Sequence, residues 1–131
     1  MRATLTNYQQ SPRKVRLVAD MIRGKEVARA RELLRFADKK SAPAVLKLLE
    51  SAVSNARLQG TQAEALFVKD IQVNMGLSMR RFMPMARGQA HTFRHRRASV
   101  ILVLDTKKEG GKGAKKAAKK AVKKAAKKKA E

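Results

Sequence analysis

The chain has 131 residues, with 32 Lys and Arg against 10 Asp and Glu, so its net charge is +22. A charge of this size predicts a polyanionic partner, most commonly nucleic acid. The absence of cysteine excludes disulfides, thiolate metal sites and a cysteine nucleophile, and it suits a reducing cytosol. No apolar run reaches the length of a membrane span, and residues 1–10 lack the apolar core of a signal peptide. We therefore expect the protein to stay in the compartment where it is made.

Three amphipathic helices are predicted after residues 1–10, whose weak alternation indicates a short strand or an extended arm. The first helix starts at Ser11-Pro12, because serine caps free amides and proline sacrifices no hydrogen bond there, and it ends at Gly24. The second spans residues 26–37, and the third spans residues 41–58. Their apolar stripes consist of Val15, Val18, Met21 and Ile22; Val27, Ala30, Leu33, Leu34 and Ala37; and Ala42, Val45, Leu49, Ala52, Val53 and Ala56.

Two strands are predicted next, over residues 66–75 and 98–104, and the segment between them is unusual. Residues 79–97 hold six arginines, two histidines and no acid, which does nothing to stabilise a domain. If the chain reverses near Ala86, the strands pair antiparallel and the hairpin, about residues 76–97, projects roughly 30 Å at 3.3 Å per residue. A mobile, solvated loop is the alternative. The arginine density favours a binding element, since guanidinium groups grip phosphates bidentately. On the first strand, Phe67, Ile71, Val73 and Met75 are expected to share the buried face.

The predicted fold class is α+β, with three helices packed on a small antiparallel sheet and a long protruding hairpin. Residues 1–106 form the globular domain. Residues 107–131 form a low-complexity tail with twelve lysines and two glutamates, and we expect it to be disordered alone and ordered by RNA. A solubilising appendage is the alternative interpretation of this tail.

The sequence offers no catalytic arrangement: paired carboxylates, a partnered serine or histidine, metal-ligand clusters and phosphate-binding glycine motifs are all missing in usable form. His91 and His95 are four residues apart in a predicted strand without a nearby acid, which argues against a metal site. We therefore expect a binding protein, with no enzymatic activity, cofactor or metal. Phe82 and Phe93 would either stack on unpaired bases or pack within the hairpin.

Folded RNA is the expected partner, because a globular face, a basic arm and a basic tail suit grooves and crevices better than a uniform duplex does. The alternative is a DNA-compacting protein of the nucleoid or linker-histone kind, for which the tail would be the main evidence. A tip that mixes Met, Pro, Gly and Arg has no use in a DNA compactor.

Three segments carry a resemblance to a known family. They are SPRKVRLVADMIRGK (residues 11–25), LLESAVSNA (48–56) and GLSMRRFMPMARGQAHTFRHRRASVILVL (76–104). The chain closely resembles the bacterial form of the large-subunit ribosomal protein L-twenty-two family over residues 1 to about 106. This resemblance implies a cytoplasmic protein of the large ribosomal subunit that binds large-subunit rRNA, contacts neighbouring ribosomal proteins and aids subunit assembly. It also implies that the hairpin lines the nascent-peptide exit tunnel and meets the nascent polypeptide.

The resemblance also assigns residues to these roles. The expected rRNA-binding residues are Arg13, Lys14, Arg16, Arg23, Lys25, Arg80, Arg81, Arg87, Arg94, Arg96 and Arg97. The expected tunnel-tip residues are Met83, Pro84, Met85, Arg87, Gly88 and Gln89. Met85 and Gln89 stand where bacterial relatives often carry basic residues, so the tip is expected to be less positive. The tail after Thr106 lies outside the family core, and no role is transferred to it.

Overall fold

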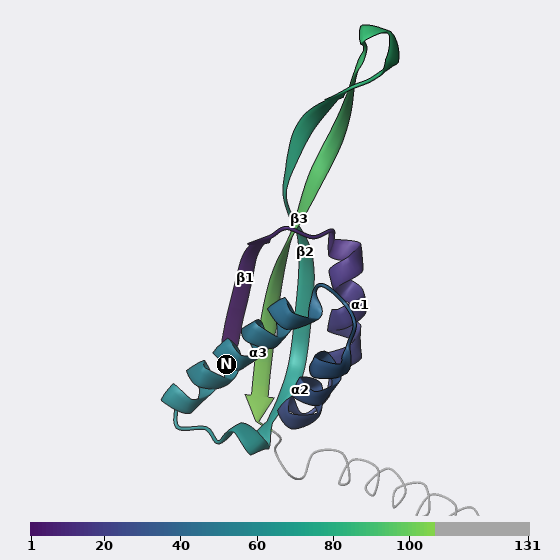
Figure 1. The fold of residues 1–131 in the computed structure, drawn as a ribbon. Helices are drawn as coiled ribbons and strands as arrows, with labels where there is room; N and C mark the ends of the chain where they lie inside the picture. The colour runs from purple at the N-terminus through teal and green to yellow at the C-terminus, as the bar shows by residue number, and fades with distance from the viewer. Residues whose placement is uncertain (107–131) are drawn as a thin grey trace, which may run out of the picture.

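A computed structural model describes residues 1–106, and the predicted tail of residues 107–131 lies outside the described residues. Three helices cover one face of a three-stranded antiparallel sheet, and the outer halves of two strands project as a hairpin (Figure 1). The elements are β1 (Arg2–Tyr8), α1 (Pro12–Ile22), α2 (Val27–Phe36), α3 (Ala42–Leu58), β2 (Leu66–Pro84) and β3 (Ala90–Thr106), with short 3-10 turns at Ala63–Ala65 and Ala86–Gly88. The α+β prediction, with its protruding hairpin, is confirmed.

The sheet has the order β1-β3-β2, so the last described strand lies between the other two. Its register places Leu102 opposite both Ala3 of β1 and Ile71 of β2. From Ala98 to Leu104, every second residue of β3 is buried against the helices, and the residues between are half-buried on the open face. This alternation follows from the two-residue period of a strand. The buried residues of β3 are Ala98, Val100, Leu102 and Leu104.

A bulge in β2 changes which of its residues face the core. Val68 pairs with Leu104 and Asp70 with Val103, so Lys69 is an extra residue that shifts the alternation by one position. The buried residues are Leu66 and Val68 before the bulge and Ile71 and Val73 after it. The predicted single face was wrong at both ends. The bulge leaves Phe67 only half-buried, while Met75 is 70% exposed because it lies at the base of the hairpin.

The three helices lie within one or two residues of their predicted bounds. The buried stripe of α1 is Val15, Val18, Ala19 and Ile22, which is the i, i+3, i+4, i+7 spacing of one helical face. Met21 was wrongly assigned to this stripe: it lies six residues after Val15, turns away from the core and is 40% exposed. The longest helix, α3, buries seven residues and supports both β1 and β3.

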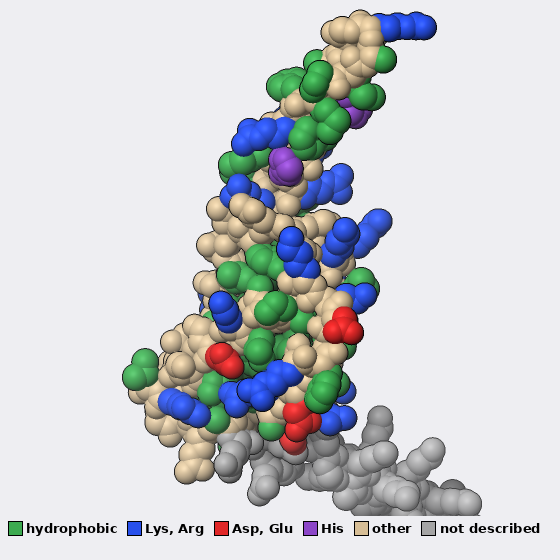
Figure 2. Space-filling view, viewed as in Figure 1, with side chains coloured by type: hydrophobic (Ala, Val, Ile, Leu, Met, Phe, Trp, Pro, Cys, Tyr) green, Lys and Arg blue, Asp and Glu red, His purple; other side chains and the backbone are tan. Residues whose placement is uncertain are grey.

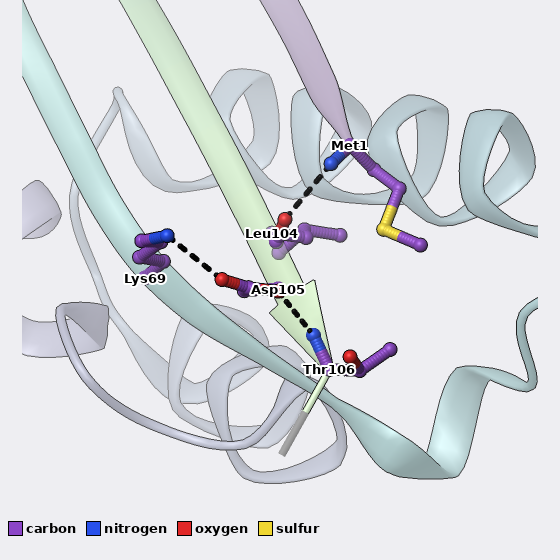
Figure 3. A network of polar contacts seen from close by, with 5 residues as sticks. All are labelled: Met1, Lys69, Leu104, Asp105 and Thr106. Carbon is purple, nitrogen blue, oxygen red and sulfur yellow. Dashed lines mark hydrogen bonds and ion pairs between the residues drawn. The ribbon is translucent and has the colours of Figure 1, made fainter. Parts of the chain in front are cut away.

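At the end of the sheet away from the hairpin, polar contacts hold the strand ends together (Figure 3). The amino group of Met1 donates to the carbonyl of Leu104 at 2.9 Å. The bulge residue Lys69 pairs with Asp105 at 2.8 Å, and the other carboxylate oxygen of Asp105 accepts the backbone N–H of Thr106 at 2.9 Å. The bulge thus places a lysine where it holds the end of β3.

We predict that this pair lowers the pKa of Asp105. The hydrogen bond from Lys69, the backbone N–H of Thr106 and the positive charge of Lys69 hold the carboxyl pKa below its usual 3.8. Because the folded-state pKa is depressed, the pair favours folding above the unfolded pKa, and this contribution is lost as pH falls through the folded pKa. In a carboxyl NMR titration, Lys69→Met should raise the Asp105 midpoint, whereas the distant Arg29→Met should leave it unchanged. A wild-type midpoint at or above 3.8 would contradict the prediction.

Candidate nucleic-acid interface

The arm, defined as residues 76–97, is a continuous two-stranded ribbon. Strands β2 and β3 pair from Ser78–Arg96 out to Pro84–Ala90, so both strands run further than the sequence predicted. Figure 1 shows the ribbon extending well beyond the helices, and the predicted reversal near Ala86 is confirmed. On the face seen in Figure 2, acidic side chains lie on the body, while the arm carries basic, hydrophobic and histidine side chains. The arm is therefore a cationic projection.

The tip is a tight turn that presents Arg87 at the apex. The N–H of Met85 donates to the carbonyl of Gln89 at 2.8 Å, which closes the turn. Arg87 and Gly88 both have positive φ, 61° and 69°. Left-handed backbone costs a residue with a side chain about 1–2 kcal/mol, so the turn bears a cost at Arg87 that glycine would avoid. The predicted tip residues Met83, Pro84, Met85, Arg87, Gly88 and Gln89 all lie in this turn or in the outermost strand pairs.

The two faces of the arm differ in chemistry, because directly opposed residues of an antiparallel pair project to the same side. Opposed pairs define an arginine face, which consists of Ser78, Arg80, Phe82, Thr92, Arg94 and Arg96. The three pairs that alternate with these define a Met–His face, which consists of Met79, Arg81, Met83, His91, Phe93 and His95. On the arginine face, Arg80 lies directly opposite Arg94, so two like charges meet across the strands.

The Met–His face is organised by its own side chains. The rings of Phe93 and His95 meet edge to face with centroids 5.0 Å apart. The guanidinium groups of Arg81 and Arg97 both donate to the sulfur of Met79, at 3.9 and 3.8 Å. Phe82 lies on the opposite face and is 71% exposed, so the two phenylalanines do not pack on each other. Phe93 therefore follows the packing interpretation, and Phe82 is left open for stacking.

Besides Arg81, three of the expected RNA-binding arginines bond within the protein. Arg16 donates from Nε and Nη2 to the carbonyl of Val73 at 3.2 and 3.0 Å. Arg23 donates to the carbonyl of Ile71 at 3.0 Å and pairs with Asp20 at 2.9 Å. Because β2 is an edge strand, these bonds satisfy backbone carbonyls that would otherwise be unpaired. Arg97 donates to the side-chain oxygen of Asn7 in β1 at 2.5 Å.

Lys14, Arg94 and Arg96 come together where the arm joins the body. They line an open hollow of about 270 Å³, shared with Gln9, Gln10 and Ser11. Lys14 comes from the first turn of α1, and the two arginines come from the arginine face of the arm. Here the structure brings together residues 80 positions apart in the sequence.

The remaining expected residues lie apart from this hollow. Arg13 is exposed at the start of α1, while Lys25 lies beyond the other end of that helix, which is about 16 Å long at 1.5 Å per residue. The backbone of Lys25 bonds to Val68, which holds this loop on the lower half of β2.

Within residues 1–106, no three His, Asp or Glu side chains gather so that they could hold a metal ion. In the same described part of the chain, no helix has the length and apolar character needed to cross a membrane.

Comparison with known proteins identifies the family. The model of the family described as ribosomal protein L22p/L17e matches residues 3–105, which includes the body and the whole arm. The chain belongs to the L22p/L17e family. The family resemblance carried by the helix and hairpin motifs is therefore confirmed.

Three curated members of the L22p/L17e family illustrate the similarity, and each is called large ribosomal subunit protein uL22. The protein of Syntrophotalea carbinolica is 42% identical over 107 residues, which is 81% of this chain and 97% of that protein. The protein of Mesoplasma florum is 46% identical over 82% of this chain and 96% of its own length. The protein of Geotalea uraniireducens is 45% identical over 81% and 96%.

In this L22p/L17e member, sequence reasoning missed the polar residues around the base of the arm. Asn7 holds Arg97, while Gln9 and Gln10 line the hollow beside Lys14. The available signal was a run of polar residues between a predicted strand and a predicted helix start, which by itself is typical of any connecting turn. Only the pairing of β1 with β3 shows that this turn lies beside the arm.

Gly76 controls the separation of the strands at the base of the arm. A Cβ atom there would lie 3.2 Å from the carbonyl oxygen of Arg97, which is closer than ordinary contact. We expect Gly76→Ala to weaken the pairing of the arm by about 1 kcal/mol, because the opposing backbone must move. Amide hydrogen exchange should accelerate in the arm and stay unchanged in residues 98–104. Leu77→Ala, at an exposed neighbouring position, is the control; equal exchange in both variants would contradict the prediction.

Proposed function

We propose that the protein is a structural constituent of the large ribosomal subunit, where it binds and scaffolds large-subunit rRNA. Membership of the L22p/L17e family supports this, as do relatives named as large ribosomal subunit proteins. The observation that carries the proposal is the arm, a paired ribbon with six arginines and no acid that projects from a folded body. In a bacterium this places the protein in the cytoplasm, within the ribosome and beside other ribosomal proteins.

The mechanism is charge neutralisation at fixed positions. Phosphates that are brought together when rRNA folds repel one another, and cationic side chains held on a rigid framework relieve that repulsion. Arginine suits this role, because its planar fork of donors matches a phosphate and its face stacks on bases. We assign the rRNA contacts to Arg13, Lys14, Arg16, Arg23, Lys25, Arg80, Arg81, Arg87, Arg94, Arg96 and Arg97. Four of these arginines would combine this role with the internal bonds described above: Arg16, Arg23, Arg81 and Arg97.

The finer proposal concerns the arm: it lines the nascent-peptide exit tunnel, and its tip meets the nascent polypeptide. From Gly76 to the turn the ribbon reaches roughly 30 Å, which is long enough to pass between RNA helices. The two faces suit two environments, since the arginine face matches phosphates while the Met–His face offers soft apolar and aromatic groups. By joining separate RNA segments, the body and arm would also aid subunit assembly.

Deleting residues 79–81, or replacing Arg87 with alanine, tests the tunnel proposal. The deletion removes an odd number of residues from β2 alone, so the outer residues change faces relative to β3. Arg87→Ala leaves the paired strands intact and removes the charge at the apex. Both changes should alter the passage of stalling peptides or the response to tunnel-binding drugs while the protein stays in the subunit. Unchanged stalling and drug response would count against the tunnel role.

We further propose that residues 107–131 form a second basic segment that follows rRNA on the outside of the subunit. Their twelve lysines and two glutamates give this segment its own excess of positive charge. Cross-linking the tail in assembled ribosomes should produce RNA adducts, and their absence would sink this part of the proposal. The DNA-compactor alternative depends on the tail, and family membership gives it no support.

Sedimentation of the tagged protein from a cell lysate tests the main proposal. The full chain and a form ending at Thr106 should both travel with the large subunit in moderate salt, since the body and arm carry the family match. High salt should weaken the association, because phosphate contacts depend on counterion release. A protein that leaves the subunit fraction and follows DNA, with truncation abolishing that behaviour, would support the compactor instead.

A further inference from the structure

The hollow at the base of the arm combines groups from two parts of the fold, the body and the arm. Lys14 belongs to α1 of the body, whereas Arg94 and Arg96 belong to the arm. Gln9, Gln10 and Ser11 complete the lining from the segment between β1 and α1. Every lining residue can therefore donate a hydrogen bond, and none of them is acidic.

The three cations of the hollow lack partners. Within residues 1–106, the side chains of Lys14, Arg94 and Arg96 make no hydrogen bond or ion pair, in contrast to Arg16, Arg23 and Arg97, which all bond internally. Ser11 is likewise not used as a helix cap by its side chain. Like charges held around one hollow repel one another until an anion enters. The arrangement is therefore complementary to a negatively charged group.

The size and donors of the hollow narrow the class of anion. At about 270 Å³ it is smaller than the roughly 300–1,000 Å³ of pockets that enclose a whole small molecule. It is also open, so it suits one group on a larger chain. Guanidinium forks, an ammonium group and neutral N–H and O–H donors are the set that binds phosphate oxygens.

The position of the hollow gives it a mechanical role. Strand β1 stops pairing with β3 at Tyr8–Ala98, so beyond this point the arm has two strands. A second irregularity, between Met75 and Ser78 of β2, lies at the same level. A two-stranded ribbon beyond a bulge is marginally stable in water, so the strand pairing alone does little to fix its direction relative to the body. A ligand held by both α1 and β3 would fix that direction.

We propose that this hollow, the arm-base site, binds one internucleotide phosphate of RNA and thereby fixes the direction of the arm relative to the body. The proposal rests on the proposed function, since it names a specific contact within the rRNA interface. On the opposite face, the bond between Arg97 and Asn7 already ties the arm to β1. The bound phosphate supplies the matching connection to α1.

The first test uses inorganic phosphate as a probe of the full chain, followed by amide and arginine side-chain NMR. Saturable shifts are expected at Gln9, Gln10, Ser11, Arg94 and Arg96. Lys14→Gln should weaken phosphate binding about tenfold, since a hydrogen bond to a charged group contributes about 1.5 kcal/mol or more. Lys47→Gln, an exposed position on α3, removes the same charge and should have no effect. Shifts spread evenly over the basic surface, or equal behaviour of the two variants, would overturn the site.

The second test separates an RNA phosphate from free phosphate. Large-subunit rRNA carrying scattered ethylated phosphates is bound by the wild-type protein and by Lys14→Gln. Ethylation of one particular phosphate should weaken binding of the wild-type protein and of Lys47→Gln. The same ethylation should not weaken binding of Lys14→Gln further. If inorganic phosphate binds but no interfering position depends on Lys14, the site takes free phosphate and the RNA assignment is wrong. Failure of the proposed function would give a different result from failure of the arm-base site. In that case the wild-type protein would not sediment with the large subunit at all.

The third test addresses the direction of the arm. Because the chain has no native cysteine, spin labels can be attached at Glu50→Cys on α3 and Gln89→Cys at the tip. Binding to rRNA should narrow the label-to-label distance distribution in the otherwise wild-type protein. Adding Lys14→Gln should leave the distribution broad even when RNA is bound, and Lys47→Gln should not. Equal narrowing with Lys14→Gln would overturn the orienting role.

Discussion

Replacing both Arg80 and Arg94 with glutamine is expected to weaken binding to large-subunit rRNA about 100-fold while making the free arm more stable. These residues face each other across the strands, so their charges repel in the free protein. Their removal relieves that repulsion, worth roughly 0.2–1 kcal/mol. In the complex, each lost contact to phosphate costs about 1.5 kcal/mol, and two such losses give the 100-fold effect. The effects in the two states thus have opposite signs.

Two measurements on the full chain check this result. Filter binding to rRNA over a range of salt should show a weaker affinity and a shallower salt dependence, with a slope lower by roughly 1.4–1.8 for two lost phosphate contacts. Amide exchange in the free arm should become slower. Arg29→Gln combined with Arg57→Gln, on the helices, removes the same charge as a control. Faster arm exchange, or equal loss of affinity in the control, would contradict the assignment of the arginine face.

Leu102→Ala is expected to lower the free energy of unfolding by roughly 3 kcal/mol. Leu102 is fully buried in β3, opposite Ala3 and Ile71, where the helices cover the sheet. Truncation removes buried apolar contacts and leaves a cavity, a change that typically costs 2–5 kcal/mol. The free energy of unfolding of a small domain is only about 5–15 kcal/mol, so this variant should lose a large share of its stability.

Thermal unfolding of the full chain measures this change, with an expected fall in Tm of at least about 12 °C. The matched control is Ile101→Ala, because Ile101 is adjacent in the same strand but lies half-buried on the open face. The Tm of Ile101→Ala should fall by less than half as much as that of Leu102→Ala. A similar fall in both variants would show that the helices do not cover the face to which Leu102 belongs.

Local chemistry was enough to predict most of the fold. Pro12 after Ser11, the helical spacing in α3 and the alternation in β3 each depend on residues a few positions apart, and all three elements were predicted. The bulge at Lys69 was not predictable in this way, since it depends on how β2 aligns with a strand about 35 residues later. That alignment placed Val68 in the core and left Phe67 only half-buried.

The candidate interface, like the fold, was only partly predictable from residues close together in the sequence. The arm was identified from its composition, but its two faces could be assigned only from the register that pairs Arg80 with Arg94. The first helix carries Lys14 and Arg16 two positions apart. From sequence alone, Arg16, which bonds to the β2 edge, could not be told apart from Lys14, which lines the hollow. Identical positive charges acquire different roles from neighbours that are distant in sequence.

The position of β3 between β1 and β2 has a consequence for the order in which the chain can fold during synthesis. The first strand has no hydrogen-bonded neighbour until residues 98–103 have been made, so its pairing closes a loop of almost the whole described chain. The helices and β2 leave the ribosome earlier, and the arm is completed just before the central strand. A newly made molecule therefore displays its cationic arm before its sheet can close. RNA could engage the arm while the body is still assembling.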